Sequence, residues 1–240
     1  MGRIQELKLT DISDELQRLA DPKDAEFLQR FFKTGPGQYG EGDLFRGIRV
    51  PVLRQLVRKF SDAPVTTAAA LLKSKYHEDR LLALLMLVKK FQRGDDATRK
   101  QIYDLYLANT RYINNWDHVD ASAGHIVGGY LFDRSRAPLT KLARSKVLWE
   151  RRISIIATLY FIQKKDFDET LRIATILLDD KHDLMHKAVG WMLREVGNRA
   201  PEVERSFLKE HYHKMPRTML RYAIEKFPEP ERKRYLLGTA

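Results

Sequence analysis

The chain has 240 residues, no cysteine, and 43 Lys and Arg against 32 Asp and Glu, which gives a formal net charge of +11. Without cysteine, disulfides, thiolate catalysis and cysteine zinc sites are excluded. An apolar fraction of 43% supports a buried core and argues against a disordered chain. The positive charge favours an anionic partner, with nucleic acid ahead of a membrane surface.

The first residues, MGRIQELKLT, are polar and lack the apolar core of a signal peptide. The longest apolar run, from Leu81 to Val88, is far shorter than the ~20 residues that span a bilayer. These two features predict a cytoplasmic protein that does not enter a membrane.

Apolar residues recur with helical spacing along the whole chain, and no stretch alternates as a strand would. The breaks fall at segments rich in Gly, Pro and Asp, such as TGPGQYGEGD at 34–43. The expected helices cover residues 11–20, 22–33, 51–60, 64–73, 78–92, 96–109, 115–132, 138–146, 149–164, 166–179, 183–198, 200–213, 216–227 and 229–236. Short connections between so many helices predict antiparallel neighbours that stack in chain order.

Small residues recur near the middle of apolar helices every 33 to 38 residues, at Ala83, Ala121 or Ser122, Ser154, Gly190 and Ala223. This period is typical of two-helix solenoid repeats, in which small residues let helices approach closely. We therefore expect one all-α domain over residues 1–240, curved so that one row of helices lines a concave face. A run of nine Lys and Arg between Asp133 and Lys165 would make that face a phosphate-tracking surface.

Two sequence patterns resemble ligand sites without their structural context. GPGQYG at 35–40 fits the dinucleotide pattern G-x-G-x-x-G, but a helical segment precedes it where a strand is required. His182 and His186 have the spacing of zinc ligands, yet no Glu completes an H-E-x-x-H motif. We predict a flexible loop at the first pattern, and no cofactor or metal for the chain.

The segment NWDHVD at 115–120 places two carboxylates beside a tryptophan. Asn114 or Asn115 can cap the helix, and Asp117 then lies in its first turn, where the helix dipole favours an acid. Asp120 follows Trp116 by four residues and shares its face, which continues on a regular helix to Gly124 and Gly128 as an open strip. An acid in a basic groove repels phosphate, so we expect Asp120 to have a functional role.

These segments together resemble the AlkD-type DNA alkylation repair glycosylases, which are built from HEAT-like repeats. The resemblance covers nearly the whole chain, in the segments GQYGEGDLFRGIRVP, WDHVD, WERR, KAVGWMLRE and MPRTMLRYAIEKF. It implies that Asp120 is catalytic and that Trp116 and Trp191 flank the deoxyribose and backbone of the lesion. It further implies that Arg152 lies near the lesion-facing phosphates, that Arg194 and Lys187 contact DNA, and that Phe31 stands where a tyrosine can occur and stacks without its hydroxyl.

The resemblance implies a monofunctional DNA glycosylase that releases 3-methyladenine and 7-methylguanine from double-stranded DNA without a base-flipping pocket. No lysine matches a Schiff-base nucleophile, so an abasic product without strand cleavage is expected. A monomer without an obligate protein partner would suffice. Two alternatives stay open: a non-catalytic helical-repeat protein that binds bent, branched or damaged DNA, and a helical-repeat protein scaffold.

Overall fold

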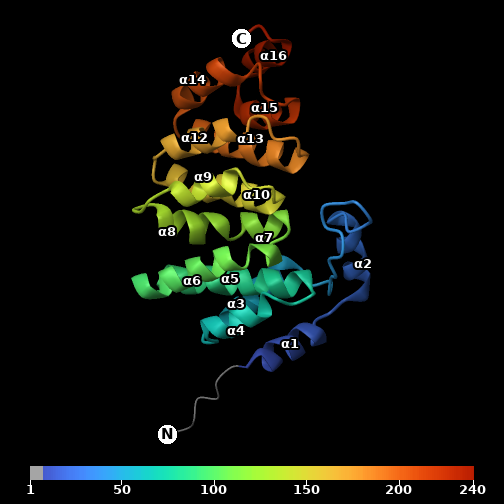
Figure 1. The fold of residues 1–240 in the computed structure, drawn as a ribbon. Coiled ribbons are helices and arrows are strands. Elements are labelled where there is room, and N and C mark those ends of the chain that lie inside the picture. Colours follow the sequence, from blue (N-terminus) through green and yellow to red (C-terminus); the bar gives the residue numbers. More distant parts are fainter. Residues whose placement is uncertain (1–7) are drawn as a thin grey trace. The chain divides into compact units, whose positions relative to one another are not determined.

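The structure, a computed structural model, describes residues 8–240 and divides into two compact units, of which unit 1 ends at Ser122 and unit 2 spans Ala123–Ala240. In the described residues all regular elements are helices, and strand-type pairing is limited to one bridge between Leu44 and Tyr76 (Figure 1). The all-α prediction is confirmed, whereas a single domain over the whole chain stays a prediction. None of the helices in this range is long and apolar enough to cross a membrane.

Unit 1 is organised around one buried helix, α5 (His77–Arg93). The other helices of this unit are α1 (Leu9–Arg18), α2 (Pro22–Phe31), α3 (Val50–Lys59), α4 (Val65–Leu71), α6 (Asp96–Ala108), the 3-10 turn η1 (Thr110–Tyr112) and α7 (Trp116–Asp120). Helices α3, α4, α6 and α7 all pack against α5. The apolar run from Leu81 to Val88 is therefore explained by burial on several sides of α5.

The loop between α2 and α3 is held on α5 by buried charges. The carboxylate of Glu78 accepts backbone N–H bonds from Arg46, Gly47 and Ile48, and Arg46 forms an ion pair with Asp79 at 2.7 Å. Gly47 has φ +83°, and a side chain there would collide with the backbone of the α2 start. These contacts fix the loop that carries Asp43 and Phe45 toward the start of α5. The segment at 35–40 is a loop, as predicted.

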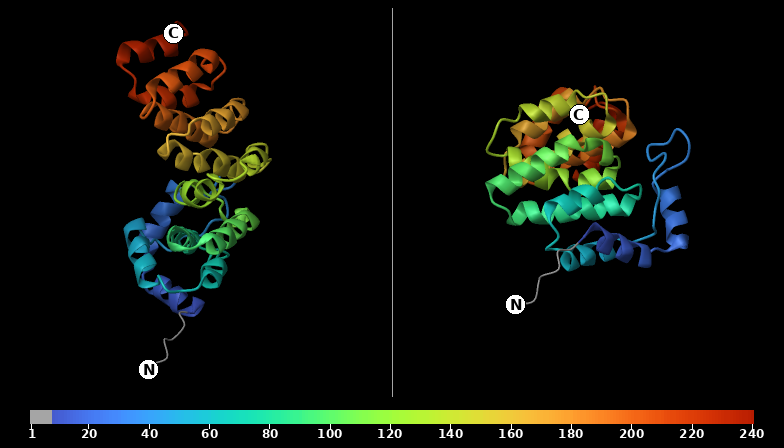
Figure 2. Two further views of the ribbon diagram at one scale, coloured as in Figure 1. Left: turned by 90° about the vertical axis from the view of Figure 1, so that its left-hand side faces the viewer. Right: turned by 60° about the horizontal axis from the view of Figure 1, so that its bottom comes forward.

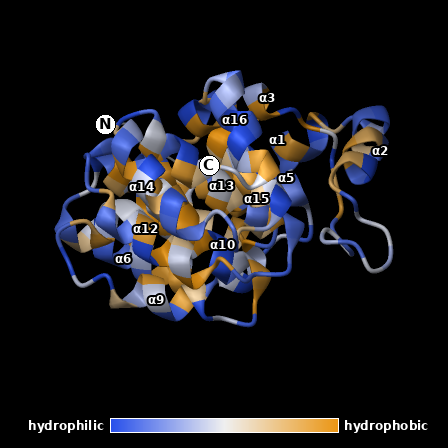
Figure 3. Cartoon of the chain, turned by 90° about the horizontal axis from the view of Figure 1, so that it is seen from above, coloured by the Kyte–Doolittle hydropathy of each residue, from blue (hydrophilic) through white to orange (hydrophobic). Residues whose placement is uncertain are grey.

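Unit 2 is a succession of helix pairs, which the left view of Figure 2 shows in chain order. Its helices are the π-helical turn η2 (Gly124–Gly128), α8 (Gly129–Leu131), α9 (Ala137–Ala143), α10 (Leu148–Ala157), α11 (Leu159–Gln163), α12 (Asp168–Ile176), α13 (Asp183–Gly197), α14 (Pro201–His211), α15 (Arg217–Ala223), the 3-10 turn η3 (Ile224–Lys226) and α16 (Glu229–Leu237). Helix α10 packs on α9 and α13, and α13 packs on α14 and α15. Many apolar residues of these helices are buried, and each helix carries hydrophobic and hydrophilic residues along its length (Figure 3).

The small residues that mark the predicted repeat lie at helix contacts. Ala83, Ser154 and Ala223 are completely buried. Gly190 lies so close to α15 that a side chain would collide with the carbonyl oxygen of Met219. At Gly190, close approach of the two helices is therefore the physical reason for the small residue.

The prediction of one continuous helix over 115–132 was wrong. Helix α7 ends at Asp120, a turn follows, and the chain resumes as the π-helical turn η2. The Ser122 hydroxyl donates to the His118 carbonyl at 2.5 Å, a side-chain bond that competes with the regular helix pattern. Gly124 and Gly128 pack against α10 within unit 2, so the open strip expected after Asp120 does not exist.

Candidate active site

A pocket of about 370 Å³ lies in unit 1 between α2, α3, α5 and α7. Its volume is in the range of small-molecule sites, and most of its wall is aliphatic or aromatic. Among its lining side chains are Phe31, Phe32, His77, Trp116, Asp117 and Asp120. Both acidic residues of NWDHVD, Asp117 and Asp120, therefore line the same pocket.

The short helix α7 begins where the sequence places its cap. The Asn115 side-chain oxygen accepts the Trp116 N–H at 2.8 Å, and Asp117 lies in the first turn and accepts the His118 N–H at 2.9 Å. The Trp116 ring stacks on Phe32 with centroids 5.3 Å apart and meets Phe31 edge-on at 6.2 Å. The half-exposed Phe31 thus belongs to the aromatic wall beside Trp116, and its stacking role toward DNA stays a prediction.

Asp120 is the last residue of α7 and is half-buried in the wall of the pocket. Its negative charge reaches Tyr106, whose pKa is raised by burial and by the charge of Asp120. The Tyr106 hydroxyl is hydrogen-bonded to the Ser122 hydroxyl at 2.9 Å. Asp120 therefore lies between the aromatic pocket and a buried hydroxyl pair at the end of its helix.

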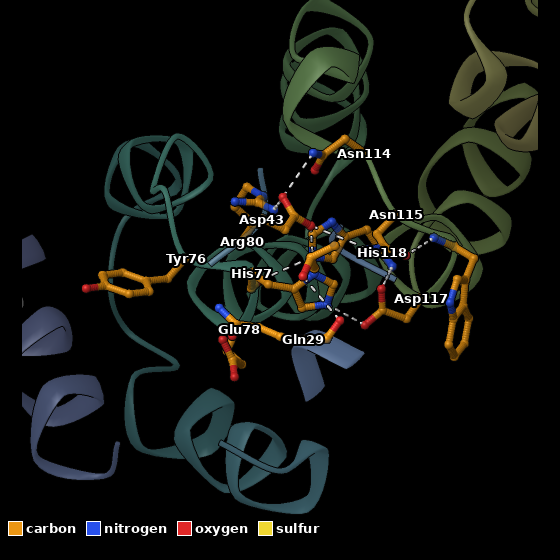
Figure 4. Close-up of polar contacts among 12 residues, drawn as sticks. Gln29, Asp43, Tyr76, His77, Glu78, Arg80, Asn114, Asn115, Asp117 and His118 are labelled. Atoms are coloured by element: carbon orange, nitrogen blue, oxygen red, sulfur yellow. Dashed lines mark hydrogen bonds and ion pairs between the residues drawn. The ribbon is translucent and has the colours of Figure 1, made fainter. Parts of the chain in front are cut away.

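A buried cluster of charged groups underlies the start of α7 (Figure 4). His77, at the first position of α5, contacts Asp117 through Nε2 at 2.8 Å and Asp43 through Nδ1 at 3.3 Å. Arg80 donates to Asp43 at 2.6 Å, and Asn114 donates to the same carboxylate at 3.2 Å. The cluster ties three segments together: the loop before α3, the start of α5 and the start of α7.

The cluster sets the charge of its members. Burial alone would lower the pKa of His77, but the carboxylates of Asp117 and Asp43 raise it to about 9. Burial would raise the pKa of Asp43, yet the bond from His77 and the charge of Arg80 hold it at about 2. The pKa of Asp117 is also lowered against the effect of burial, chiefly by His77. At neutral pH His77 is therefore a cation bonded to two ionised carboxylates.

His118 is the neutral member of this cluster. Burial and the charge of His77 lower its pKa to about 3, and its Nε2 donates to the His77 carbonyl at 3.1 Å. Its ring stacks on that of His77 with centroids 4.1 Å apart. His77, Asp117 and His118 offer ligand atoms within 4.8 Å of one another, close enough for a metal ion. The direct His77–Asp117 bond and the stacked rings explain this arrangement as a hydrogen-bonded cluster.

The remaining predicted residues lie in unit 2. The Trp191 indole N–H donates to Glu195 at 3.3 Å, and the guanidinium of the buried Arg152 donates to the Leu184 carbonyl at 2.7 Å. Arg194 is paired with Glu225, and Lys187 with Asp183 at 2.7 Å. Arg194 and Lys187 lie on α13, each about one helical turn from Trp191. Their roles toward DNA stay predictions.

A family model described as DNA alkylation repair enzyme matches residues 12–227. The chain belongs to this family. A solved structure described as a predicted DNA alkylation repair enzyme from Enterococcus faecalis is similar at a TM-score of 0.67 and 17% identity, over 88% of this chain and 97% of that chain. At this identity the likeness shows a shared fold, and it confirms the helical-repeat architecture. Comparison with curated proteins gave no match.

Membership of this family supports a role in DNA alkylation repair, and the sequence alone missed part of the site that would serve it. Asp43 and His77 lie 34 residues apart, and His77 and Asp117 lie 40 apart, so their cluster exists only through the tertiary fold. Phe32 follows the predicted Phe31, but only the structure shows that its ring stacks on Trp116. The sequence indicates only a helix-start role for Asp117, whereas in the structure this residue also lines the pocket and binds His77.

Proposed function

We propose that the protein is a monofunctional DNA glycosylase that hydrolyses the N-glycosidic bond of cationic alkylpurines, 3-methyladenine and 7-methylguanine, in duplex DNA. The observation that carries this proposal is that Asp120 and Trp116 line one aromatic pocket in a member of a DNA alkylation repair family. Both residues match the positions that the AlkD-type resemblance assigns to the catalytic acid and to one lesion-flanking tryptophan.

In this reaction the cationic base is a good leaving group, so catalysis depends mainly on stabilising the sugar. Alkylation at N3 or N7 leaves the base positively charged, so the electrons of the breaking glycosidic bond neutralise it as it departs. The deoxyribose becomes oxocarbenium-like, and a water molecule adds to its anomeric carbon and loses a proton. An ionised Asp120 would stabilise the sugar cation and orient that water. The negative face of Trp116 would favour the same cation by about 0.5–2 kcal/mol.

The protein would bind DNA through contacts with the sugar-phosphate backbone, which do not depend on the base sequence. Trp191 would complete the aromatic pair, while Arg152, Arg194 and Lys187 would hold phosphates in register without reading bases. Selectivity would then come from the lability of the cationic lesion, without extrusion of the base into a pocket. An uncharged lesion such as 1,N6-ethenoadenine should accordingly be a poor substrate.

The decisive experiment measures free base released from methylated duplex DNA by the wild-type protein and by Asp120→Asn. We expect release to fall about 100-fold or more, because the group that meets the developing positive charge is lost. Asp104→Asn is the matched control, since Asp104 is an exposed acid on α6 that pairs with Lys100 one turn earlier and lies outside the pocket lining. Undiminished release by Asp120→Asn would exclude the catalytic role of that residue.

The same assay separates the alternatives. Salt-sensitive binding to bent or branched duplexes with no release of base would favour the non-catalytic DNA binder. Absent or salt-insensitive DNA binding would favour a protein scaffold. A product cleaved at the abasic site would contradict the monofunctional assignment.

A further inference from the structure

His77 lies between two carboxylates and can donate a hydrogen bond to both only when its ring is protonated. Its Nε2 is 2.8 Å from Asp117 and its Nδ1 is 3.3 Å from Asp43. A neutral imidazole has one N–H donor, whereas the protonated ring has two. The side chain is almost completely buried, and the rings of Phe32 and Phe45 pack against it at 4.7 Å and 4.5 Å. The imidazolium therefore meets these anions in a site of low dielectric, where the interaction is strong.

The charges that face His77 from each neighbouring segment add up to a compensated set. The loop contributes Asp43, α5 contributes Arg80, and α7 contributes Asp117 together with the neutral His118. Arg80 is paired with Asp43 at 2.6 Å, which leaves the imidazolium as the partner of Asp117. Within this hydrogen-bonded set two carboxylates face two cations, and the cation bonded to Asp117 is His77. Glu78, Arg49 and Arg54 also line the pocket, and none of the test variants changes them.

Asp117 matters to the reaction because of what lies beside it. Asp117 and Asp120 are three residues apart on α7 and line the same pocket. A carboxylate near a second carboxylate disfavours the ionisation of that second group. If Asp117 were an uncompensated anion, Asp120 would bind a proton more readily and lose the charge that the proposed hydrolysis requires.

We propose that His77 is a positioning and charge-compensating residue for Asp120: its imidazolium cancels the negative charge of Asp117 and fixes the start of α7, so that Asp120 stays ionised in the pocket. This proposal rests on the proposed glycosylase function for its link to catalysis. In this role His77 acts on Asp120 through Asp117, to which its Nε2 is bonded.

The test compares the ionisation of Asp120 in four proteins: wild type, His77→Gln, Asp117→Asn and the double variant. Loss of the His77 cation exposes Asp120 to Asp117 and should raise the acidic midpoint by about one pH unit. Loss of the Asp117 anion leaves His77 under-compensated and should lower the midpoint. The double variant removes both charges and should return the midpoint to the wild-type value.

Two readouts follow this midpoint. One is the acidic limb of the rate of base release against pH. The other is the carboxyl carbon resonance of Asp120 in a protein labelled at aspartate, assigned by its loss in Asp120→Asn. The second readout needs no catalysis, so failure of the glycosylase proposal would show as absent base release while the titration still tests the role of His77.

The inference would be established if the Asp120 midpoint shifts in opposite directions in the two single variants and returns to the wild-type value in the double variant. An unchanged midpoint in His77→Gln, shifts of equal sign in both single variants, or a double variant that stays displaced would overturn it. A purely structural role for His77 predicts lower stability in His77→Gln without restoration of the midpoint by Asp117→Asn. If His77→Gln does not fold, the comparison of Asp117→Asn with wild type decides, because an unshifted or raised midpoint there contradicts the proposal.

Discussion

Replacing Glu204 by glutamine is expected to stabilise the protein, and the gain should grow as the pH rises. Glu204 lies on α14 against Gly197 at the end of α13, the helix that carries Trp191 and Arg194. Its side chain is 2% exposed, and its Oε1 has no hydrogen-bond partner in the described residues. Burial raises the pKa of this carboxyl to about 8. The native state therefore holds Glu204 protonated at neutral pH.

The magnitude follows from the difference in pKa between the two states. Below pH 4.5 the group is protonated in native and unfolded chains alike, and it costs no stability. Between pH 4.5 and about 8 the unfolded chain releases the proton while the native protein keeps it, so stability falls as the pH rises. The loss is about 1 kcal/mol at pH 5 and about 3 kcal/mol at pH 7. Glutamine has no such proton to lose, so the variant should recover most of this free energy.

The assay is urea-induced unfolding of wild type and Glu204→Gln at pH 5, 6, 7 and 8. Glu204→Met is a second variant, since it removes the polar atoms that lack partners. Glu202→Gln is the control on the same helix, because Glu202 is 89% exposed and should change stability by no more than about 0.5 kcal/mol. Stability curves of Glu204→Gln and wild type that run parallel from pH 5 to pH 8 would refute the assignment of a protonated native carboxyl.

Two further substitutions have matched controls in the chain. Gly128→Ala should destabilise the protein by about 2 kcal/mol or more, because the added Cβ would collide with the Ala157 carbonyl. Gly124→Ala is the control and should be tolerated, because its Cβ would lie 3.5 Å from the nearest atom. Equal thermal melting temperatures for the two variants would contradict this prediction. Phe31→Ala should weaken binding to methylated duplex DNA about threefold to tenfold, because an aromatic side chain of the pocket wall is lost. Phe27 lies outside the pocket lining, so Phe27→Ala should weaken binding less. Fluorescence anisotropy measures the affinity of both variants.

Local patterns in the sequence predicted the all-α class and the approximate positions of most helices, but not every helix break. Asn115 caps α7 as its residue type predicts, and the small residues of the repeat lie at helix contacts. Periodicity failed where a side chain altered the backbone, since Ser122 bonds the His118 carbonyl and the expected long helix breaks there. Apolar spacing cannot detect such a break, because the residues on both sides still look helical.

The electrostatic part of the site could not be predicted from the sequence. Asp43, His77 and Asp117 come from three segments and meet only when the loop before α3 is fixed on α5. Each is an ordinary residue in its local context. His118 had no assigned role, yet burial beside His77 makes it a neutral ring that stacks on an imidazolium. Such roles follow from tertiary neighbours, which spacing along the chain does not encode.

The two acids of NWDHVD show how surroundings divide functions between identical side chains. Asp117 accepts hydrogen bonds from the His118 N–H and the His77 ring. These bonds compensate its charge within the protein and stabilise the start of α7. Asp120, one turn later, stands at the wall formed with Trp116 and Phe31, where a sugar cation could meet it. An anion that is compensated internally offers little to a transition state, because its field is already neutralised. On the proposed function, the same pocket would hold one carboxylate whose charge is compensated by His77 and one, Asp120, whose charge remains available to the substrate.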